Sequence, residues 1–336
     1  MSTYFVTGAA GFIGANFVRQ VLDEEPAARV IAYDSLTYAG NLENLADRLN
    51  DERLSFVRGD ICDAEAVRAA LGAGVDVIVN FAAESHVDRS ILGCAAFVRT
   101  NIQGTQVLLD TARACEVGRF VQISTDEVYG ALGPTGKFTE QTPLQPNSPY
   151  SASKAGADML VRAYYHTYRM PVLLTRCSNN YGPYQFPEKL IPLFVTNLLE
   201  AKKVPVYGDG MQVRDWIHVA DHCRAIRRVI EAGRPGEVYN VGGNNEQPNL
   251  NITRLILSRL GFDDSMIEHV KDRPGHDRRY AVDCSRIMAE LGWKPLVDFE
   301  AGLAETIDWY RRNESWWRRI KTGEYLKYYQ EQYGGR

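Results

Sequence analysis

A tyrosine and a lysine four positions apart, Tyr150 and Lys154, form the first pair in the sequence that could carry a reaction. Residues with this spacing lie on one face of a helix, so the ammonium group would lie beside the phenol. At about 4 Å and an effective dielectric near 20, the ammonium favours the phenolate by up to ~4 kcal/mol. Before the opposing effect of burial is subtracted, this brings a phenol pKa from about 10 toward neutrality. The pair therefore predicts a base that takes an alcohol proton, although most such spacings are solvated helix faces.

The segment Ser124-Thr125-Asp126-Glu127 supplies a second set of reactive groups. It closes an apolar run that we expect to be a strand, and ligands of open α/β sheets bind at the carboxyl ends of strands. Adjacent carboxylates are usually solvated, by about ten to one for an arbitrary Asp-Glu pair. At a strand end near Tyr150, two carboxyls in different environments could instead divide the work of acid and base in a dehydration. We expect both carboxyls to face the cavity that holds the redox pair.

A glycine-rich turn, Thr7-Gly8-Ala9-Ala10-Gly11-Phe12-Ile13-Gly14, links the first strand-like run to a helical one. Glycines let the backbone approach a pyrophosphate, and the helix N-terminus supplies free N–H groups. Asp34 ends the second strand-like run 20 residues after Gly14. A carboxylate there can bind ribose hydroxyls and repels a 2′-phosphate, which favours NAD over NADP. Gly59-Asp60-Ile61 is expected to flank the adenine, and a purely structural glycine turn is the alternative, with a weight of about one in ten.

Strand-like runs alternate with helical segments through the first half of the chain, which predicts a parallel sheet covered on both faces. We expect strands at 4–7, 30–34, 54–57, 75–81, 120–124 and 172–175. The expected helices are 14–22, 41–49, 64–71, 95–115 and 151–168, then 188–202, 219–232, 251–260, 285–291 and 299–312. The predicted fold class is α/β: a Rossmann-like doubly wound parallel sheet over residues 1–176, then a smaller mixed α/β substrate domain over 177–336. Strand-like segments near 214–218 and 237–241 are expected to return to the first sheet.

The composition excludes several other classes of protein. The 336 residues are 45% apolar and 24% charged with a net charge of −4, which is typical of a globular protein and gives no basic surface for nucleic acid. No stretch reaches the roughly 18 consecutive apolar residues of a membrane span, and no signal peptide is visible. The six cysteines are scattered without a CxxC pair, which is typical of reduced thiols and shows no metal-ligand spacing. We expect a cytoplasmic protein without a metal.

Longer segments resemble the extended short-chain dehydrogenase/reductase superfamily, which uses TGxxGxxG, YxxxK and a Ser or Thr on the preceding strand. Within it the chain is most similar to the nucleotide-sugar 4,6-dehydratases, above all those that act on dTDP-glucose. The resemblance runs over roughly residues 1–312 and is carried by the segments 34–41, 82–90, 124–130, 179–192 and 272–280. It implies tightly bound NAD, a nucleotide-diphosphate sugar as substrate, with dTDP-glucose first, and a homodimer formed through 95–115 and 151–168. The apolar faces of those two helices could equally pack inside one subunit.

The resemblance also implies a lyase reaction with no net redox change. Tyr150, beside Lys154, would remove the proton of the C4 hydroxyl as hydride passes to NAD, and Thr125 would hydrogen-bond O4. Glu127 would then take the C5 proton, and Asp126 would protonate the C6 hydroxyl and expel water. Return of hydride to C6 and of a proton to C5 would give dTDP-4-keto-6-deoxyglucose. These five residues are the expected catalytic set.

Binding residues follow from the turn, the strand ends and the resemblance together. The expected cofactor-binding residues, besides Tyr150 and Lys154, are Gly8, Gly11, Phe12, Ile13, Gly14, Asp34, Ser35, Leu36, Thr37, Asp60, Ile61, Ala82, Ala83, Thr100 and Asn180. The resemblance implies that the substrate is held, besides Thr125, by Ser85, Asn179, Lys189, Leu190, Pro205, Tyr207, Arg214, Asn249, Arg273, His276 and Tyr280.

Some of these assignments have ordinary alternatives. Arg214 and Arg273 suit bidentate phosphate contact, whereas a lone arginine is more often in a surface ion pair. His276 could serve the ribose or base, or be a structural histidine. Asn249 is less secure because Gln247-Pro248 departs from the pattern of the relatives. Packing roles are expected for Trp216, Trp316 and Trp317, and no role is assigned to the tail after Arg312.

Other functions share parts of this pattern. A nucleotide-sugar 4-epimerase has the same fold, NAD and YxxxK motif, but it has no need of Asp126 and Glu127. A nonenzymatic NAD-binding sensor would be expected to lack part of the Thr125, Tyr150 and Lys154 set, which is complete here. An oxidoreductase that consumes NAD stoichiometrically fits less well again. The residues alone leave the base of the nucleotide and the later deoxysugar pathway open.

Overall fold

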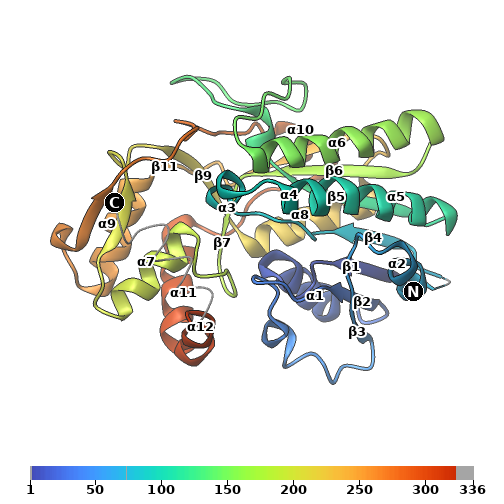
Figure 1. Cartoon of the computed structure of the whole chain (residues 1–336), viewed down its shortest axis with the longest axis horizontal. Coiled ribbons are helices and arrows are strands. Elements are labelled where there is room, and N and C mark those ends of the chain that lie inside the picture. The colour runs from blue at the N-terminus through green and yellow to red at the C-terminus, as the bar shows by residue number, and fades with distance from the viewer. Residues whose placement is uncertain (1, 73, 323–336) are drawn as a thin grey trace.

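Seven parallel strands form the central sheet of the molecule (Figure 1). The structure is a computed structural model that describes residues 2–72 and 74–322. The strand order is β10-β6-β5-β4-β1-β2-β3, and each neighbouring pair is parallel. The bounds are β1 (Thr3–Thr7), β2 (Arg29–Asp34), β3 (Leu54–Arg58), β4 (Val77–Asn80), β5 (Arg119–Thr125), β6 (Val172–Cys177) and β10 (Val238–Val241). The predicted doubly wound sheet is confirmed, and its strand order reverses between β1 and β4, where such sheets open a crevice at their carboxyl edge.

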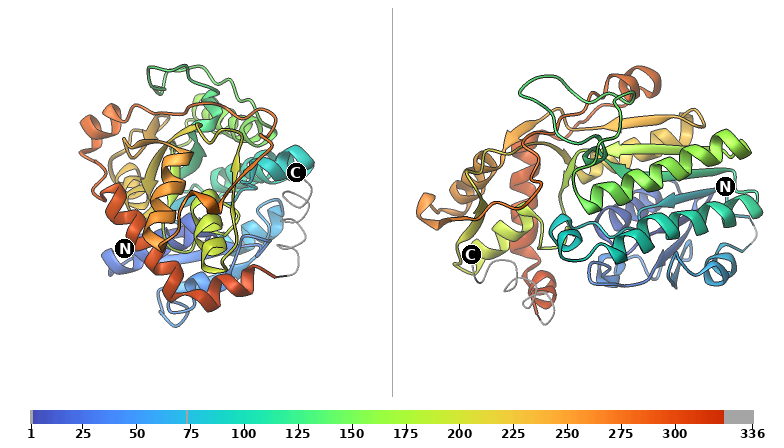
Figure 2. Two further views of the ribbon diagram at one scale, coloured as in Figure 1. Left: turned by 90° about the vertical axis from the view of Figure 1, so that its left-hand side faces the viewer. Right: turned by 45° about the horizontal axis from the view of Figure 1, so that its top comes forward.

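Helices cover both faces of this sheet, as its nearly continuous apolar strands require. Helices α1 (Phe12–Glu24) and α8 (Val219–Ala232) pack against each other over one face, and α10 (Ser285–Leu291) lies beside β10. The other face carries α2 (Ala64–Leu71), α5 (Thr105–Ala114) and α6 (Pro149–Tyr168). Helices α5 and α6 lie side by side in the right-hand view of Figure 2. Two short helices, α3 (Val87–Leu92) and α4 (Ala95–Phe97), follow β4.

Helix α6, which carries Tyr150 and Lys154, begins at a strong start signal. The hydroxyl of Ser148 accepts from Ser151 N at 3.1 Å, and the hydroxyl of Ser151 accepts from Ser148 N at 3.0 Å. This reciprocal capping box satisfies two N–H groups that the helix itself leaves unpaired. Pro149 at the first helical position adds a backbone angle already set for a helix. The cap therefore fixes Tyr150 in the first turn of α6.

The chain after β6 builds a smaller lobe, at the left of Figure 1. Its sheets are β11-β9-β7, made of β7 (Asn179–Tyr181), β9 (Val213–His218) and β11 (Glu246–Pro248), and β12-β8, made of β8 (Val204–Tyr207) and β12 (Ile267–Val270). The smaller lobe has its own hydrophobic core, which four helices surround: α7 (Leu190–Leu199), α9 (Asn249–Leu260), α11 (Phe299–Arg312) and α12 (Glu314–Ile320). The lobe is mixed α/β, while the division of the chain at residues 176 and 177 stays a prediction.

Three expected elements differ from the structure. The helix expected at 95–115 is interrupted by a π-helical turn, Val98–Gly104, where the amide of Asn101 bonds to both the N–H and the carbonyl of Glu84. At 41–49 there is a 3-10 turn, Leu42–Leu45, because Asn44 is buried and bonds to the glycine turn at Ala10. The segment near 214–218 pairs with β7 and β11 in the smaller lobe, so its expected return to the first sheet is wrong. The segment near 237–241 does return there, as β10.

The tail after Arg312, to which the sequence assigned no role, includes a docked helix. Trp317 in α12 is 0% exposed, and its indole donates to Tyr310 O at 2.9 Å. The indole of Trp316 donates to the Asn44 side chain at 2.9 Å, and Asn44 in turn donates to Ala10 O in the glycine turn. Helix α12 therefore packs in the smaller lobe and also supports the glycine turn of the larger one. Residues 323–336 of the tail lie outside the described residues.

We predict that Trp317→Ala lowers the free energy of unfolding by about 3–5 kcal/mol, the usual effect of truncating a fully buried tryptophan. Urea titration followed by circular dichroism measures this change. The control is Leu296→Ala, whose side chain is 65% exposed and should change stability by no more than about 0.5 kcal/mol. Equal, small losses in both variants would mean that α12 does not contribute to the folded core.

Candidate active site

Two adjoining cavities lie between the larger sheet and the smaller lobe. The first, of about 490 Å³, opens at the carboxyl ends of β1, β2, β4 and β5. The second, of about 140 Å³, is lined mainly by the smaller lobe and the α3 segment. Both cavities are lined by Glu127, Asn179, Glu188, Lys189, Leu190 and Trp216. A single elongated ligand could therefore extend from one cavity into the other.

The glycine turn brings bare backbone to the wall of the first cavity. A Cβ on Gly14 would lie 2.2 Å from Gly8 O, and a Cβ on Gly8 would lie 2.7 Å from Ala82 N. Gly8 also has a positive φ of 64°, which side-chain-bearing residues rarely adopt. Neither position can carry a side chain without displacing backbone. The turn leads directly into α1, whose first N–H groups suit a pyrophosphate.

Asp34 ends β2 at the rim of the same cavity. Its carboxylate accepts from Ala10 N at 2.9 Å and from Leu36 N at 2.8 Å. Burial raises the pKa of this carboxyl, and the two backbone hydrogen bonds oppose the shift. A Cβ on Gly40 would lie 2.6 Å from Asp34 Oδ1, so the loop closes tightly around the group. The carboxylate is thus fixed at the position where a dinucleotide ribose is bound in sheets of this kind.

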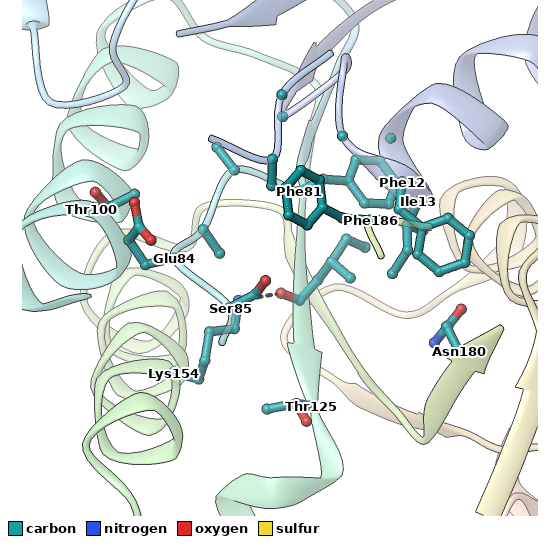
Figure 3. Close-up of a pocket in the computed structure, with 18 of the residues that line it drawn as sticks. Phe12, Ile13, Phe81, Glu84, Ser85, Thr100, Thr125, Lys154, Asn180 and Phe186 are labelled. Carbon is teal, nitrogen blue, oxygen red and sulfur yellow. Dashed lines mark hydrogen bonds between the residues drawn. The ribbon is translucent and has the colours of Figure 1, made fainter. Parts of the chain in front are cut away.

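Lys154 and Thr125 lie where β5 meets α6 (Figure 3). Tyr150, Lys154 and Thr125 all line the first cavity, and Lys154 Nζ donates to Ile123 O at 2.6 Å. Burial raises the pKa of Tyr150 well above its usual value, Glu127 raises it further, and a hydrogen bond with Thr125 opposes this. Burial also lowers the pKa of Lys154. The lowering of the Tyr150 pKa that its spacing from Lys154 predicts, before burial is subtracted, is therefore opposed by the burial of both groups in the protein alone, and the role of the pair stays a prediction.

The neighbouring carboxyls, Asp126 and Glu127, face the cavities and lie in different environments. Asp126 is 1% exposed, and within the described part of the chain its Oδ2 has no hydrogen-bond partner. Burial raises the pKa of Asp126 well above its usual value, and the charges of Glu127 and Asp215 add to the shift. Burial also raises the pKa of Glu127, but Arg273, Lys189 and Arg214 oppose it. Burial thus raises the pKa of both carboxyls, and neighbouring cations oppose it more at Glu127 than at Asp126.

The second cavity gathers cationic and aromatic groups. Arg214 is 5% exposed, lies with its guanidinium 4.2 Å from the centre of the Tyr280 ring, and donates to Asp277 O at 2.9 Å. Arg273 pairs with Asp88 at 3.3 Å. His276 bonds to Asp272 through Nδ1 at 2.6 Å, and burial and Arg273 lower its pKa to about 4. A buried and a half-buried guanidinium, Arg214 and Arg273, beside one cavity suit a diphosphate.

Nearly all residues predicted for the site line one of these cavities. In the first are Gly8, Gly11, Phe12, Ile13, Gly14, Asp34, Ser35, Thr37, Asp60, Ile61, Ala82, Ala83, Ser85, Thr100, Thr125, Asp126, Glu127, Tyr150, Lys154 and Asn180. In the second are Pro205, Tyr207, Arg214, Asn249, Arg273, His276 and Tyr280, and in both are Asn179, Lys189 and Leu190, as well as Glu127. Leu36 lines neither cavity, and its contribution is the N–H that binds Asp34. The individual roles stay predictions.

Several lining residues were missed by sequence reasoning. Glu188 and Phe186 stand beside the predicted Lys189, but an acid and a phenylalanine there gave no signal of their own. Arg89 Nε pairs with Glu188 at 3.1 Å, its guanidinium lies 4.0 Å from the centre of the Tyr38 ring, and Tyr38 meets Phe186 edge-on at 5.6 Å. These contacts join the loop after β2 to the loop before α7 beside the first cavity.

Trp216 was assigned to packing and has a second role as a cavity wall. It belongs to the core of the smaller lobe, yet it lines both cavities. An aromatic residue in an alternating strand pattern predicts only burial, so the sequence could not distinguish the two roles. The packing assignments of Trp316 and Trp317 agree with their buried positions in α12.

Within residues 2–72 and 74–322, no group of three or more His, Cys, Asp or Glu side chains is arranged to hold a metal ion. No helix in the same ranges is long and apolar enough to cross a membrane.

Comparison with known proteins gives matches along almost the whole chain. A family model described as GDP-mannose 4,6 dehydratase matches residues 5–306. The dTDP-glucose 4,6-dehydratase of an Actinoplanes species is 55% identical over 93% of this chain and 98% of its own. The Escherichia coli protein of the same name is 48% identical over 98% of this chain and 99% of its own.

Solved structures agree with these sequence matches. The dTDP-glucose 4,6-dehydratase of Streptomyces venezuelae, with NAD and TYD bound, has a TM-score of 0.93 at 55% identity and covers 95% of this chain and 100% of its own. A UDP-glucose 4-epimerase of Thermotoga maritima, with UDP-glucose, has a TM-score of 0.86 at 28% identity. It covers 93% of this chain and 99% of its own.

We predict that Asp126→Asn stabilises the protein by about 0.5–2 kcal/mol at pH 7, because it removes a desolvated carboxyl. The sign follows from the raised pKa: above about pH 4 the unfolded chain ionises this group while the folded chain retains the proton, so rising pH favours unfolding. The advantage of the variant should therefore disappear as the pH falls below about 4. Thermal unfolding between pH 4 and pH 8 measures it.

The matched control is Asp158→Asn, because Asp158 is equally buried but pairs with Arg176 at 2.9 Å. Breaking that pair should destabilise the protein by about 3–5 kcal/mol. A loss of stability at pH 7 in Asp126→Asn would contradict the protonated state assigned to Asp126.

Proposed function

The chain belongs to the GDP-mannose 4,6 dehydratase family, and we propose that it dehydrates dTDP-glucose to dTDP-4-keto-6-deoxyglucose with NAD as its cofactor. The relatives named dTDP-glucose 4,6-dehydratase, at 48% and 55% identity over nearly the full length, support this substrate. The single observation that carries the proposal is the pair Asp126 and Glu127, which line the same cavity as Tyr150 and lie in different charge environments.

The residues of the first cavity fit NAD. Gly8 and Gly14 let the turn pack closely on the backbone of Ala82 and on itself, where a Cβ would clash, so that bare backbone faces the place of a pyrophosphate. Asp34 suits ribose hydroxyls rather than a 2′-phosphate. Solved relatives contain NAD. Bound NAD supplies a hydride acceptor for the oxidation of the sugar and returns the hydride within the same turnover. Its positive charge would also favour the phenolate of Tyr150, which burial in the protein alone disfavours.

The proposed chemistry begins at the C4 hydroxyl of the hexose. Tyr150 takes the hydroxyl proton, Thr125 hydrogen-bonds O4, and the ammonium of Lys154, anchored on Ile123 O, stabilises the phenolate. A ketone at C4 makes the neighbouring C5–H acidic. Each well-placed acid or base contributes roughly 10²–10⁴ in rate.

Water is then lost between C5 and C6. Glu127, in the field of Arg273, Lys189 and Arg214, takes the C5 proton. Asp126, whose carboxyl retains its proton because it is buried, protonates the leaving hydroxyl on C6. The proposal assigns the diphosphate to Arg214 and Arg273 in the second cavity, so that the hexose extends toward the carboxyl pair.

A nucleotide-sugar 4-epimerase is less well supported. Its chemistry returns hydride to C4 and needs no acid–base pair beyond the redox base. The Thermotoga maritima epimerase is 28% identical, whereas the Streptomyces venezuelae dehydratase is 55% identical. The two adjacent carboxyls also have no evident use in an epimerase.

The assembly and location of the protein remain part of the proposal. We expect a homodimer, and the exposed apolar side chains Leu92, Val98 and Met159, on α3, the π turn and α6, support a contact there. We also expect a cytoplasmic enzyme, in keeping with cysteines that are all unpaired.

An isotope experiment tests the reaction directly. With dTDP-glucose deuterated at C4, we predict a product lighter by one water that retains the deuterium at C6. With unlabelled substrate in D₂O, one solvent deuterium should enter C5. Mass spectrometry and NMR read both positions, and UDP-glucose run in parallel tests the choice of base. A product of unchanged mass, or passage of the C4 deuterium into free NADH, would contradict the proposal.

The division of roles is tested by two variants. In Glu127→Gln, the C4 hydroxyl is still oxidised but elimination stalls, so we predict enzyme-bound NADH and turnover lowered by about 10²–10⁴-fold. In Tyr150→Phe, turnover falls similarly but no NADH forms, because the first proton transfer is lost. Absorbance at the NADH band under single-turnover conditions distinguishes the variants. Loss of NADH formation in Glu127→Gln would reassign Glu127 to the oxidation step.

A further inference from the structure

A buried polar network lies behind the candidate site and lines neither cavity. Arg176 Nε pairs with Asp158 Oδ2 at 2.9 Å, and the exposed fractions of the two side chains are 5% and 0%. Arg176 Nη1 also donates to the hydroxyl of Tyr129 at 3.0 Å. That hydroxyl donates in turn to Asn240 Oδ1 at 2.7 Å. The network therefore connects four side chains without solvent.

These four residues come from four different elements. Asp158 is on α6, Arg176 on β6 and Asn240 on β10, while Tyr129 ends the 3-10 turn Asp126–Tyr129. In the sheet, Arg176 stands opposite Ser124 of β5 on one side and Asn240 of β10 on the other. Arg176 is thus the central member, bonded to α6 in one direction and to the 3-10 turn in the other.

The two elements joined by Arg176 are those that carry the candidate catalytic groups. Helix α6 holds Tyr150 and Lys154, with Asp158 one turn further along the same face. The 3-10 turn holds Asp126 and Glu127 at its start and Tyr129 at its end. A shift of the turn relative to α6 would move the acid and the base but leave the redox pair in place.

Core packing alone does not account for such a network. A buried ion pair is often replaced by apolar residues of similar volume with no loss of stability. Directional hydrogen bonds, in contrast, select one arrangement of the elements that they join. The Tyr129 ring already packs against Phe138, with centroids 4.9 Å apart and planes at 23°, so its hydroxyl serves the polar contacts only.

We propose that Tyr129, held by Arg176 and Asp158, is a positioning residue that sets the place of Asp126 and Glu127 relative to Tyr150. The inference rests on the proposed function and adds a specific requirement to it: the elimination step depends on the Tyr129 hydroxyl more than the oxidation step does. Misplacement of a reacting group by about 1 Å lowers a rate by up to ~100-fold.

The test is Tyr129→Phe in the full-length protein with bound NAD, which keeps the ring and its stacking and removes only the hydroxyl. With dTDP-glucose, oxidation at C4 should proceed near the wild-type rate, while turnover falls about 10- to 100-fold and bound NADH accumulates. Stopped-flow absorbance at the NADH band and product mass give the two rates separately. A merely structural role would lower the melting temperature without causing NADH to accumulate.

The control is Tyr239→Phe, another fully buried tyrosine, whose hydroxyl bonds to Glu290 at 3.0 Å and lies outside the network. It loses comparable hydrogen bonds and should show no build-up of NADH. Unchanged turnover in Tyr129→Phe, or equal slowing of oxidation and elimination, would overturn the inference while wild-type activity still supports the proposed function. Failure of the wild-type protein to release water from dTDP-glucose would overturn both.

Discussion

The placement of two adjacent carboxyls in one cavity is the constraint on which the rest of the site depends. Removing a carboxylate from water is unfavourable, so its pKa rises unless cations compensate. Burial raises the pKa of Asp126 well above its usual value, and it raises the pKa of the half-buried Glu127 against the opposing charges of Arg273, Lys189 and Arg214. The cations belong to the smaller lobe, whereas the carboxyls follow a strand of the larger sheet. The difference between the two groups therefore exists only when both lobes are in place.

The parallel sheet makes this convergence possible. Because all its strands run in one direction, the ends of β1, β2, β4 and β5 meet at a single edge, where the glycine turn, Asp34 and Thr125 line one cavity. The capping box of α6 fixes the start of that helix at the same edge. Local signals thus position Tyr150 and Lys154, while contacts between segments distant in sequence position Asp126 and Glu127.

This difference explains what the sequence could predict. The strands, the glycine turn and the Tyr150–Lys154 spacing are local patterns. The predicted site residues other than Leu36 line one of the two cavities, and the predicted parallel sheet is present. The return of β9 to the first sheet was wrong because a short strand pattern does not specify its partner. The π turn in 95–115 depends on a contact between Asn101 and Glu84, and the Tyr150 pKa depends on burial. Neither the π turn nor the Tyr150 pKa can be predicted from the local spacing of residues.

The two fully buried aspartates of this region separate stability from chemistry. Asp158 pairs with the guanidinium of Arg176 at 2.9 Å and lines neither cavity. Its charge is therefore compensated, and it contributes to the structure around the site. One oxygen of each carboxyl, Asp158 Oδ1 and Asp126 Oδ2, lacks a hydrogen-bond partner in the described part of the chain. Asp126 differs because the charges of Glu127 and Asp215 add to the rise that burial gives its pKa, and because it faces the cavity. A buried carboxyl beside like charges is unfavourable for stability. Its place beside Glu127 and Tyr150 fits the proposed role of Asp126 as the proton donor.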